Sequence, residues 1–148
     1  MTARVSERLK RLVHDRAHGL CEYCRISRQY SMMPFCVEHI IPRALKGSNS
    51  LENLALACQG CNGHKHAKIE GPDPITQKRI RFFHPRHDLW TDHFVWSHDY
   101  LTVLGTTPTG RATVQALHLN RQGLLNLRAL LHGAGLHPPR EPDQPPQK

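Results

Sequence analysis

The chain has 148 residues, which suits one compact domain or a small domain with an appended subdomain. Lysine and arginine outnumber aspartate and glutamate by 20 to 12, and the resulting formal net charge of +8 favours a polyanionic partner such as nucleic acid. No run approaches the roughly 18 apolar residues of a membrane helix, and residues 1–19 lack the apolar core of a signal peptide, so we expect a cytoplasmic protein with no membrane partner.

The first half of the chain is predicted to contain two helices and two strands. Apolar spacing indicates a first helix that begins after a candidate N-cap, Ser6, and stops at Gly19. A β-branched run that ends at Pro42 indicates the first strand. In chain order, we expect a helix over 6–18, a strand over 36–41, a loop over 46–50, a strand over 54–57 and a helix over 59–69.

The second half is predicted to add a hairpin and two helices. Its aromatic residues favour a buried core over base-stacking platforms. In chain order, we expect a hairpin with Phe94 and Trp96 against Leu101 and Val103, then helices over 109–119 and 121–132. The polar, proline-rich end is expected to be disordered. The predicted organisation is a core at 1–70, an extension packed on or beside it at 71–136, and a tail at 137–148.

Four of the five cysteines form two Cys-x-x-Cys pairs, Cys21 with Cys24 and Cys58 with Cys61. Under reducing conditions, such pairs point to a metal rather than to disulfides. Both sulfurs of each pair can face one tetrahedral zinc ion at about 2.3 Å, and four thiolates leave no open coordination position. We therefore predict a structural zinc that does not activate water. Cys36 lies in a predicted strand and is expected to be a small buried thiol.

An acid, an imidazole and an amide lie between and beside these cysteine pairs. Glu38 and His39 are adjacent, so their side chains would point to opposite faces of a strand. Asn62 and His66 lie four residues apart and would share one face of a helix. Carboxylate, amide and imidazole groups can hold one divalent ion with water positions left open, as phosphodiester hydrolysis requires. A histidine with a reference pKa of about 6.5 suits proton removal from the attacking water.

The motifs occur in the order EHIIP, Asn53-Leu54 and CQGCNGHK, which resembles the HNH nuclease family over about residues 20–68. The resemblance implies a small ββα-metal core braced by the four-cysteine zinc site. With the elements predicted above, we expect an α+β fold that adds an N-terminal helix and a C-terminal hairpin-plus-helices extension.

The resemblance also implies roles for individual residues. His39 corresponds to the general base, and Asn53 to the residue that holds the loop orienting it. Glu38 stands where the family usually has aspartate, and both Glu38 and Asn62 are expected to bind a catalytic divalent ion, Mg²⁺ or Mn²⁺. The remaining candidates are His66 as a further ligand of this ion, and Arg43 and Lys65 as phosphate contacts.

We therefore expect a metal-dependent endonuclease that hydrolyses phosphodiester bonds in DNA with one catalytic ion and a histidine general base. RNA stays open as a substrate. Two other interpretations compete with this one. In one, the chain is a non-catalytic, zinc-braced nucleic-acid-binding module. In the other, it is an accessory subunit of a DNA-processing complex.

Overall fold

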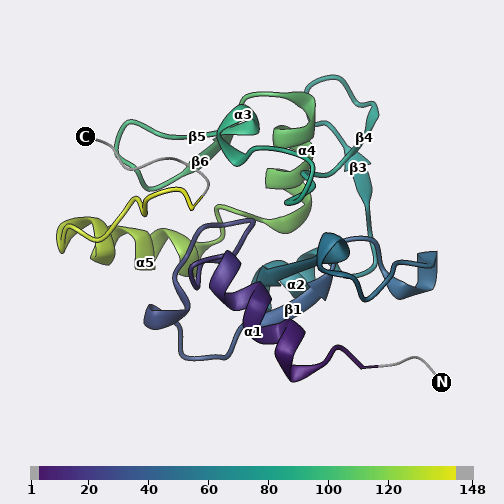
Figure 1. Cartoon of the computed structure of the whole chain (residues 1–148). Coiled ribbons are helices and arrows are strands. Elements are labelled where there is room, and N and C mark those ends of the chain that lie inside the picture. Colours follow the sequence, from purple (N-terminus) through teal and green to yellow (C-terminus); the bar gives the residue numbers. More distant parts are fainter. Residues whose placement is uncertain (1–3, 143–148) are drawn as a thin grey trace.

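The structure is a computed structural model that describes residues 4–142 (Figure 1). Its α-helices are α1 (Glu7–Arg16), α2 (Gln59–Lys65), α3 (Trp90–His93), α4 (Pro108–Leu117) and α5 (Gln122–Gly133). Its strands are β1 (Cys36–His39), β2 (Leu54–Ala57), β3 (Glu70–Pro72), β4 (Arg79–Arg81), β5 (Phe94–Trp96) and β6 (Val103–Gly105). Short 3₁₀ helices are η1 (Arg28–Tyr30), η2 (Arg43–Leu45) and η3 (Leu51–Asn53). This mixture of helices and small sheets confirms the predicted α+β class.

The strands pair as three antiparallel hairpins, β1 with β2, β3 with β4, and β5 with β6. In the first hairpin, Glu38 lies opposite Ala55 and His39 lies opposite Leu54. Strand pairing therefore ends at His39, the predicted general base, and the next loop begins directly after it.

Helix α1 covers one face of this hairpin. Ser6 accepts a hydrogen bond from the Leu9 amide at 3.2 Å and so caps the helix as predicted. Val13 is fully buried and packs with Leu54 and Leu56 of β2. The alternate β2 residues, Ala55 and Ala57, face the larger core instead. Strand β2 is consequently buried on both faces.

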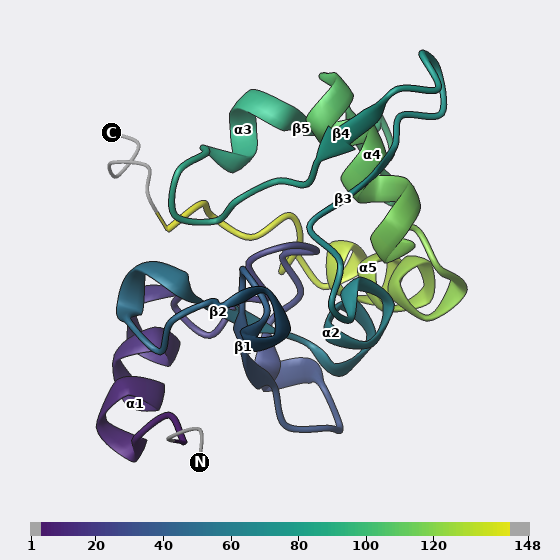
Figure 2. The ribbon, with the colours of Figure 1, turned by 90° about the vertical axis from the view of Figure 1, so that its right-hand side faces the viewer.

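The larger core joins the first and second halves of the chain. Figures 1 and 2 both place β3–β6, α3 and α4 on one side of α1, β1, β2 and α2. The core contains the four paired cysteines together with Phe83, Trp90 and Phe94 from the second half. The Trp90 indole donates to the Tyr23 main-chain oxygen at 2.9 Å. The extension therefore packs directly on the cysteine-containing core.

Two elements of the second half were absent from the sequence predictions, the β3–β4 hairpin and α3. The strands of the hairpin have three residues each, too short for a periodicity signal, and β3 includes a glycine and a proline. The hairpin turn is held by Asp73, which is fully buried and accepts from Arg111 Nε and Nη2 of α4 at 2.9 Å each. Asp73 and Arg111 are 38 positions apart, so their bidentate contact gives no local pattern in the sequence.

Helix α2 ends at Lys65, four residues before its predicted end. His66 has φ +51° and ψ −128°, a conformation outside the helix, and the chain continues into β3. In the predicted β5–β6 hairpin, Trp96 lies opposite Val103, whereas Leu101 lies before β6 in the connecting loop.

The chain after α5 passes over the extension. His137 is buried and its Nε2 lies 2.8 Å from the Tyr100 main-chain oxygen, while Glu141 forms an ion pair with Arg25 at 2.7 Å. These contacts lie within the tail predicted to be disordered, and residues 143–148 of that tail are outside the described residues. None of the helices within residues 4–142 has the length and apolarity needed to cross a bilayer.

Candidate active site and metal clasp

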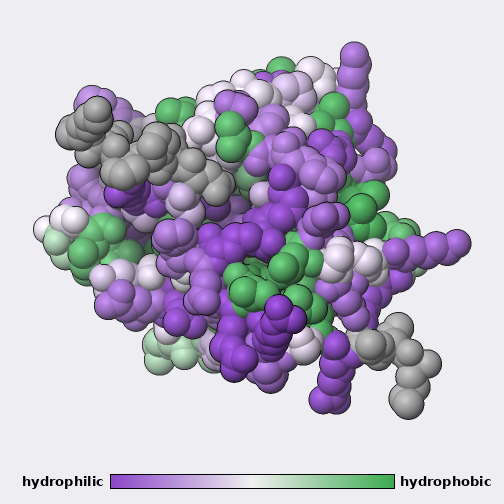
Figure 3. Space-filling model, viewed as in Figure 1, coloured by the Kyte–Doolittle hydropathy of each residue, from purple (hydrophilic) through white to green (hydrophobic). Residues whose placement is uncertain are grey.

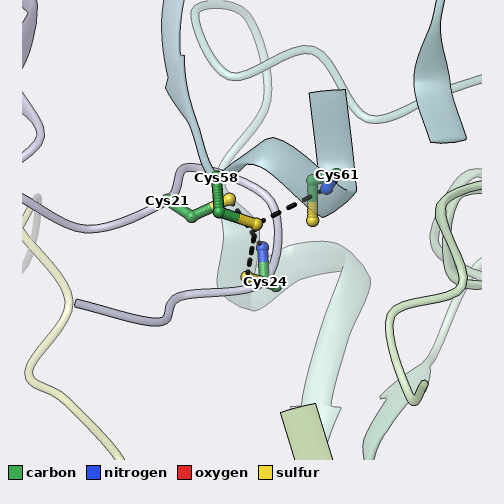
Figure 4. A group of neighbouring side chains, drawn as sticks. All are labelled: Cys21, Cys24, Cys58 and Cys61. Atoms are coloured by element: carbon green, nitrogen blue, oxygen red, sulfur yellow. Dashed lines mark hydrogen bonds between the residues drawn. The ribbon is translucent and has the colours of Figure 1, made fainter. Parts of the chain in front are cut away.

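The four paired cysteines come together as one group, which we call the metal clasp (Figure 4). Cys21 and Cys24 lie in the turn after α1, whereas Cys58 caps α2 and Cys61 lies in its first turn. The four sulfur atoms lie within 4.8 Å of one another, and all four residues are buried. Residues 25–57 thus form a loop whose two ends are joined at the clasp.

The geometry of the clasp fits a tetrahedral ion. With metal–sulfur distances of about 2.3 Å, two sulfurs of a tetrahedral site are separated by about 3.8 Å. The Cys24 and Cys58 sulfurs lie 3.7 Å apart. The amides of Cys24 and Cys61 point at the sulfurs of Cys21 and Cys58, at 3.5 and 3.4 Å. The four cysteines are therefore positioned to bind a metal, and the site is compatible with structural zinc. Cys36 is half-buried and outside this group.

His39 lies at the end of β1 and is held by a residue that the sequence analysis did not single out. Its Nε2 lies 2.7 Å from Asn49 Oδ1, and Arg43 Nη2 donates to the same oxygen at 3.2 Å. Because a guanidinium can only donate, the Asn49 atom that it meets is the amide oxygen. That oxygen accepts from His39, so Nε2 carries a hydrogen, and in the neutral imidazole Nδ1 is the nitrogen with the lone pair.

Asn53 ties the loop before β2 to the end of β1. Its Oδ1 accepts from the Ile41 amide at 2.8 Å, and its Nδ2 donates to the main-chain oxygens of Ile41 and Ser48 at 3.0 and 2.8 Å. The loop approaches so closely that a Cβ at Gly47 would lie 1.7 Å from the Ile41 oxygen. Asn53 is thus placed to hold the loop that carries Asn49.

Glu38 points to the opposite face of β1 and into the interior. One carboxylate oxygen accepts from the Tyr23 hydroxyl, and the other lies 3.2 Å from Lys65 Nζ. Burial raises the pKa of Glu38, and the Lys65 ammonium opposes that shift. Burial raises the pKa of Tyr23 as well, so its hydroxyl stays protonated and donates. Both Glu38 oxygens are therefore engaged inside the protein, which differs from the expected metal-ligand arrangement.

The interior position of Lys65 corrects the prediction that it contacts phosphate. Its side chain is 2% exposed, and its Nζ also donates to the Ile40 main-chain oxygen at 2.9 Å. The ammonium joins the last turn of α2 to the end of β1, and a phosphate on the surface cannot reach it.

The other predicted residues surround one open pocket of about 380 Å³ between β1 and α2. His39, Arg43, Asn62 and His66 all line this pocket, and Glu38 borders it although its carboxylate is held inside. At about 30 Å³ per water, the volume admits a hydrated ion with a phosphate group. The pocket thus combines a candidate base, two candidate ligands of an ion and a cation.

A comparison with protein-family models matches residues 21–68 to a family described as HNH endonuclease. The segment is similar in sequence to HNH domains. It includes the four clasp cysteines and all predicted active-site residues, and it implies a nucleic-acid substrate. No curated protein and no solved structure matches the chain.

Three residues around the HNH site could not be identified from the sequence. Asn49 is one polar residue among several in the loop, and Tyr23 lies between two clasp cysteines. Arg121, which lies against the clasp, is 60 positions from Cys61. For Asn49 the only available signal was its position in the loop between the His39 and Asn53 motifs.

The clasp geometry predicts unequal effects of two cysteine substitutions. Cys58→Ser should release the metal and unfold the protein, because structural zinc sites of this kind supply on the order of 10–16 kcal/mol. Cys36→Ser should leave both metal content and fold nearly unchanged. Metal analysis and circular dichroism would check this, and a fully folded, metal-free C58S protein would contradict it.

The buried Glu38–Lys65 pair predicts a non-additive double mutant. Glu38→Gln should lower the free energy of unfolding by about 3–5 kcal/mol, because it leaves the Lys65 ammonium buried without its counter-charge. The double variant E38Q/K65M should recover most of that loss, since no buried charge remains. Urea unfolding of the metal-loaded proteins measures both. A double variant less stable than either single variant would show that the ion pair is not the cause.

Proposed function

We propose that the chain is a metal-dependent endonuclease that hydrolyses phosphodiester bonds in DNA, and that zinc occupies the clasp. One observation supports this most strongly. His39, held through Nε2 by Asn49, lines the same open pocket of the HNH domain as Asn62, His66 and Arg43. The pocket is open to solvent, so a phosphate of a large substrate can reach it.

In the proposed reaction, His39 removes a proton from the attacking water. Nδ1 is the acceptor, because Nε2 donates to Asn49. The Asn49 oxygen then remains hydrogen-bonded to the imidazolium that forms, and Asn53 keeps the Asn49 loop in place. Arg43 lies beside this oxygen and lines the pocket, where its positive charge favours a phosphate.

Asn62 and His66 are the residues best placed to hold the catalytic divalent ion, proposed to be Mg²⁺ or Mn²⁺. Both lie at the surface of the pocket, on the last turn of α2 and directly after it. Such an ion polarises the phosphate and stabilises the charge on the leaving oxygen. Asn62 and His66 would hold the ion as neutral ligands, so they would leave its positive charge available to a substrate phosphate. Glu38 can join them only by leaving Tyr23 and Lys65.

DNA attraction is supported by the exposed basic residues of the N-terminal segment. Arg4, Arg8 and Arg11 are exposed beside or on α1, and on the face that carries α1 hydrophilic surface surrounds a hydrophobic patch (Figure 3). Basic side chains on such a surface bind phosphates without reading sequence.

A second candidate function is a non-catalytic nucleic-acid-binding module or an accessory subunit. The observation in its favour is the Glu38–Lys65 ion pair, which keeps the one carboxylate of the predicted ligand set away from the pocket. This candidate predicts DNA binding without cleavage.

Substitution of His39 distinguishes the two. His39→Ala should lower the cleavage rate by about 10²–10⁴, the usual contribution of a general base, while clasp metal, fold and DNA affinity stay close to wild type. The matched control is His98→Ala, because His98 is exposed in the β5–β6 turn. Plasmid nicking at low salt with Mg²⁺ or Mn²⁺ gives the rate.

Two outcomes would contradict the proposal. If H39A cuts DNA as fast as wild type, His39 is not the base. If wild-type protein binds DNA but does not cut it with any divalent ion, the non-catalytic candidate is correct.

A further inference from the structure

Arg121 of the extension lies against the metal clasp. Its Nη2 is 3.3 Å from the Cys58 sulfur and 3.7 Å from the Cys61 sulfur, and its Nη1 is 3.6 Å from the Cys61 sulfur. Nη1 also donates to the main-chain oxygens of Leu117 and His118, at 3.3 and 3.2 Å, where α4 ends. Arg121 is itself the N-cap residue of α5. One guanidinium therefore connects the α4–α5 junction to two clasp cysteines.

The start of α2 is shaped to admit this guanidinium. Gly60 lies between Cys58 and Cys61, and a Cβ at this position would lie 2.4 Å from Arg121 Nη2 and 2.7 Å from its Cζ. Atoms that are not bonded do not approach so closely. A helix otherwise favours alanine over glycine, so the space that Gly60 leaves serves the contact with Arg121.

Arg128, on the same helix, brings a second positive charge into the core. It is fully buried and donates to the main-chain oxygens of Leu101 and Leu119 at 3.0 and 2.7 Å. Within residues 4–142, no carboxylate forms an ion pair with Arg128 or with Arg121. Burial lowers the pKa of Arg128.

The loaded clasp would supply the missing negative charge. Cysteines that bind a metal are deprotonated, so four thiolates around one divalent ion have a net charge of −2. Arg121 brings a positive charge into contact with the sulfurs of Cys58 and Cys61. Hydrogen bonds from a guanidinium to an ionised acceptor are stronger than those between neutral groups, and a buried ion without a counter-charge is strongly unfavourable.

We propose that Arg121 binds the thiolates of the metal-loaded clasp, so that metal retention and the docking of the α4–α5 segment depend on each other. The inference depends on a metal at the four cysteines and is independent of nuclease activity. The extension is thereby a part of the metal site, and its docking responds to whether the clasp is loaded.

The first test measures zinc affinity by competition with a chromophoric zinc chelator. Arg121→Met should weaken zinc binding by about 10- to 100-fold, as loss of a hydrogen bond to a metal ligand commonly does. The matched control is Arg79→Met, which removes an exposed arginine of the extension that pairs with Glu70. R79M should bind zinc as tightly as wild type. Equal affinity of R121M and wild type would overturn the proposal.

A double-mutant comparison separates the contact from a general loss of structure. Gly60→Ala should weaken zinc binding in the wild-type background, because the new Cβ displaces the guanidinium. In the R121M background the same change should have little effect, since nothing opposes the Cβ and alanine suits the helix. If R121M does not fold, R121K serves as the background, because lysine lacks the Nη2 and Cζ atoms that the Cβ would meet. An equal loss from G60A in both backgrounds would overturn the proposal.

Docking is read out by amide hydrogen exchange on zinc-loaded R121M. Exchange in α5 should rise relative to wild type, while exchange in α1, which packs on the other side of β2, should not change. Unchanged exchange in α5 would show that Arg121 does not hold the extension on the clasp.

Discussion

The convergence of four cysteine sulfurs is the constraint on which the rest of the structure depends. The sulfurs join the turn after α1 to the start of α2, so both ends of residues 25–57 are fixed at one point. A chain of this size can bury only a modest core, and a metal adds stabilisation that apolar packing alone would not provide. The larger core is built around the clasp, with aromatic residues from the extension packed against it.

The two faces of β1 are used differently. Glu38 faces inward to Tyr23 and Lys65, whereas His39 lies at the strand end beside the pocket. Inward-facing groups join β1 to α2, and outward-facing groups are available for chemistry. Two asparagines fix the loop that follows β1. Asn53 binds the main chain of this loop, and Asn49 binds the His39 imidazole. Rigid interior contacts thus position a site that is itself open.

Much of this arrangement could be predicted from the sequence because the signals are local. The Cys-x-x-Cys spacing predicts the clasp, the cap at Ser6 predicts the start of α1, and residues 54–57 form the predicted strand. The direction in which Lys65 points could not be predicted, because a short helix with few apolar residues does not show which face is buried. The contact of Arg121 with the clasp could not be predicted either, because a contact between residues 60 positions apart depends on how the extension folds back.

The extension packs around the four cysteines and shares one core with them. Its aromatic residues fill the core beside the cysteines, and its Arg121 lies against the sulfurs of Cys58 and Cys61. Residues outside the segment matched by the family model therefore pack against the four cysteines within it.

X-ray absorption at the zinc edge of the purified protein tests the central claim most directly. We expect one zinc ion per chain with four sulfur neighbours at about 2.3 Å and no nitrogen or oxygen neighbour. A folded protein without zinc, or a zinc ion with fewer than four sulfur neighbours, would contradict it.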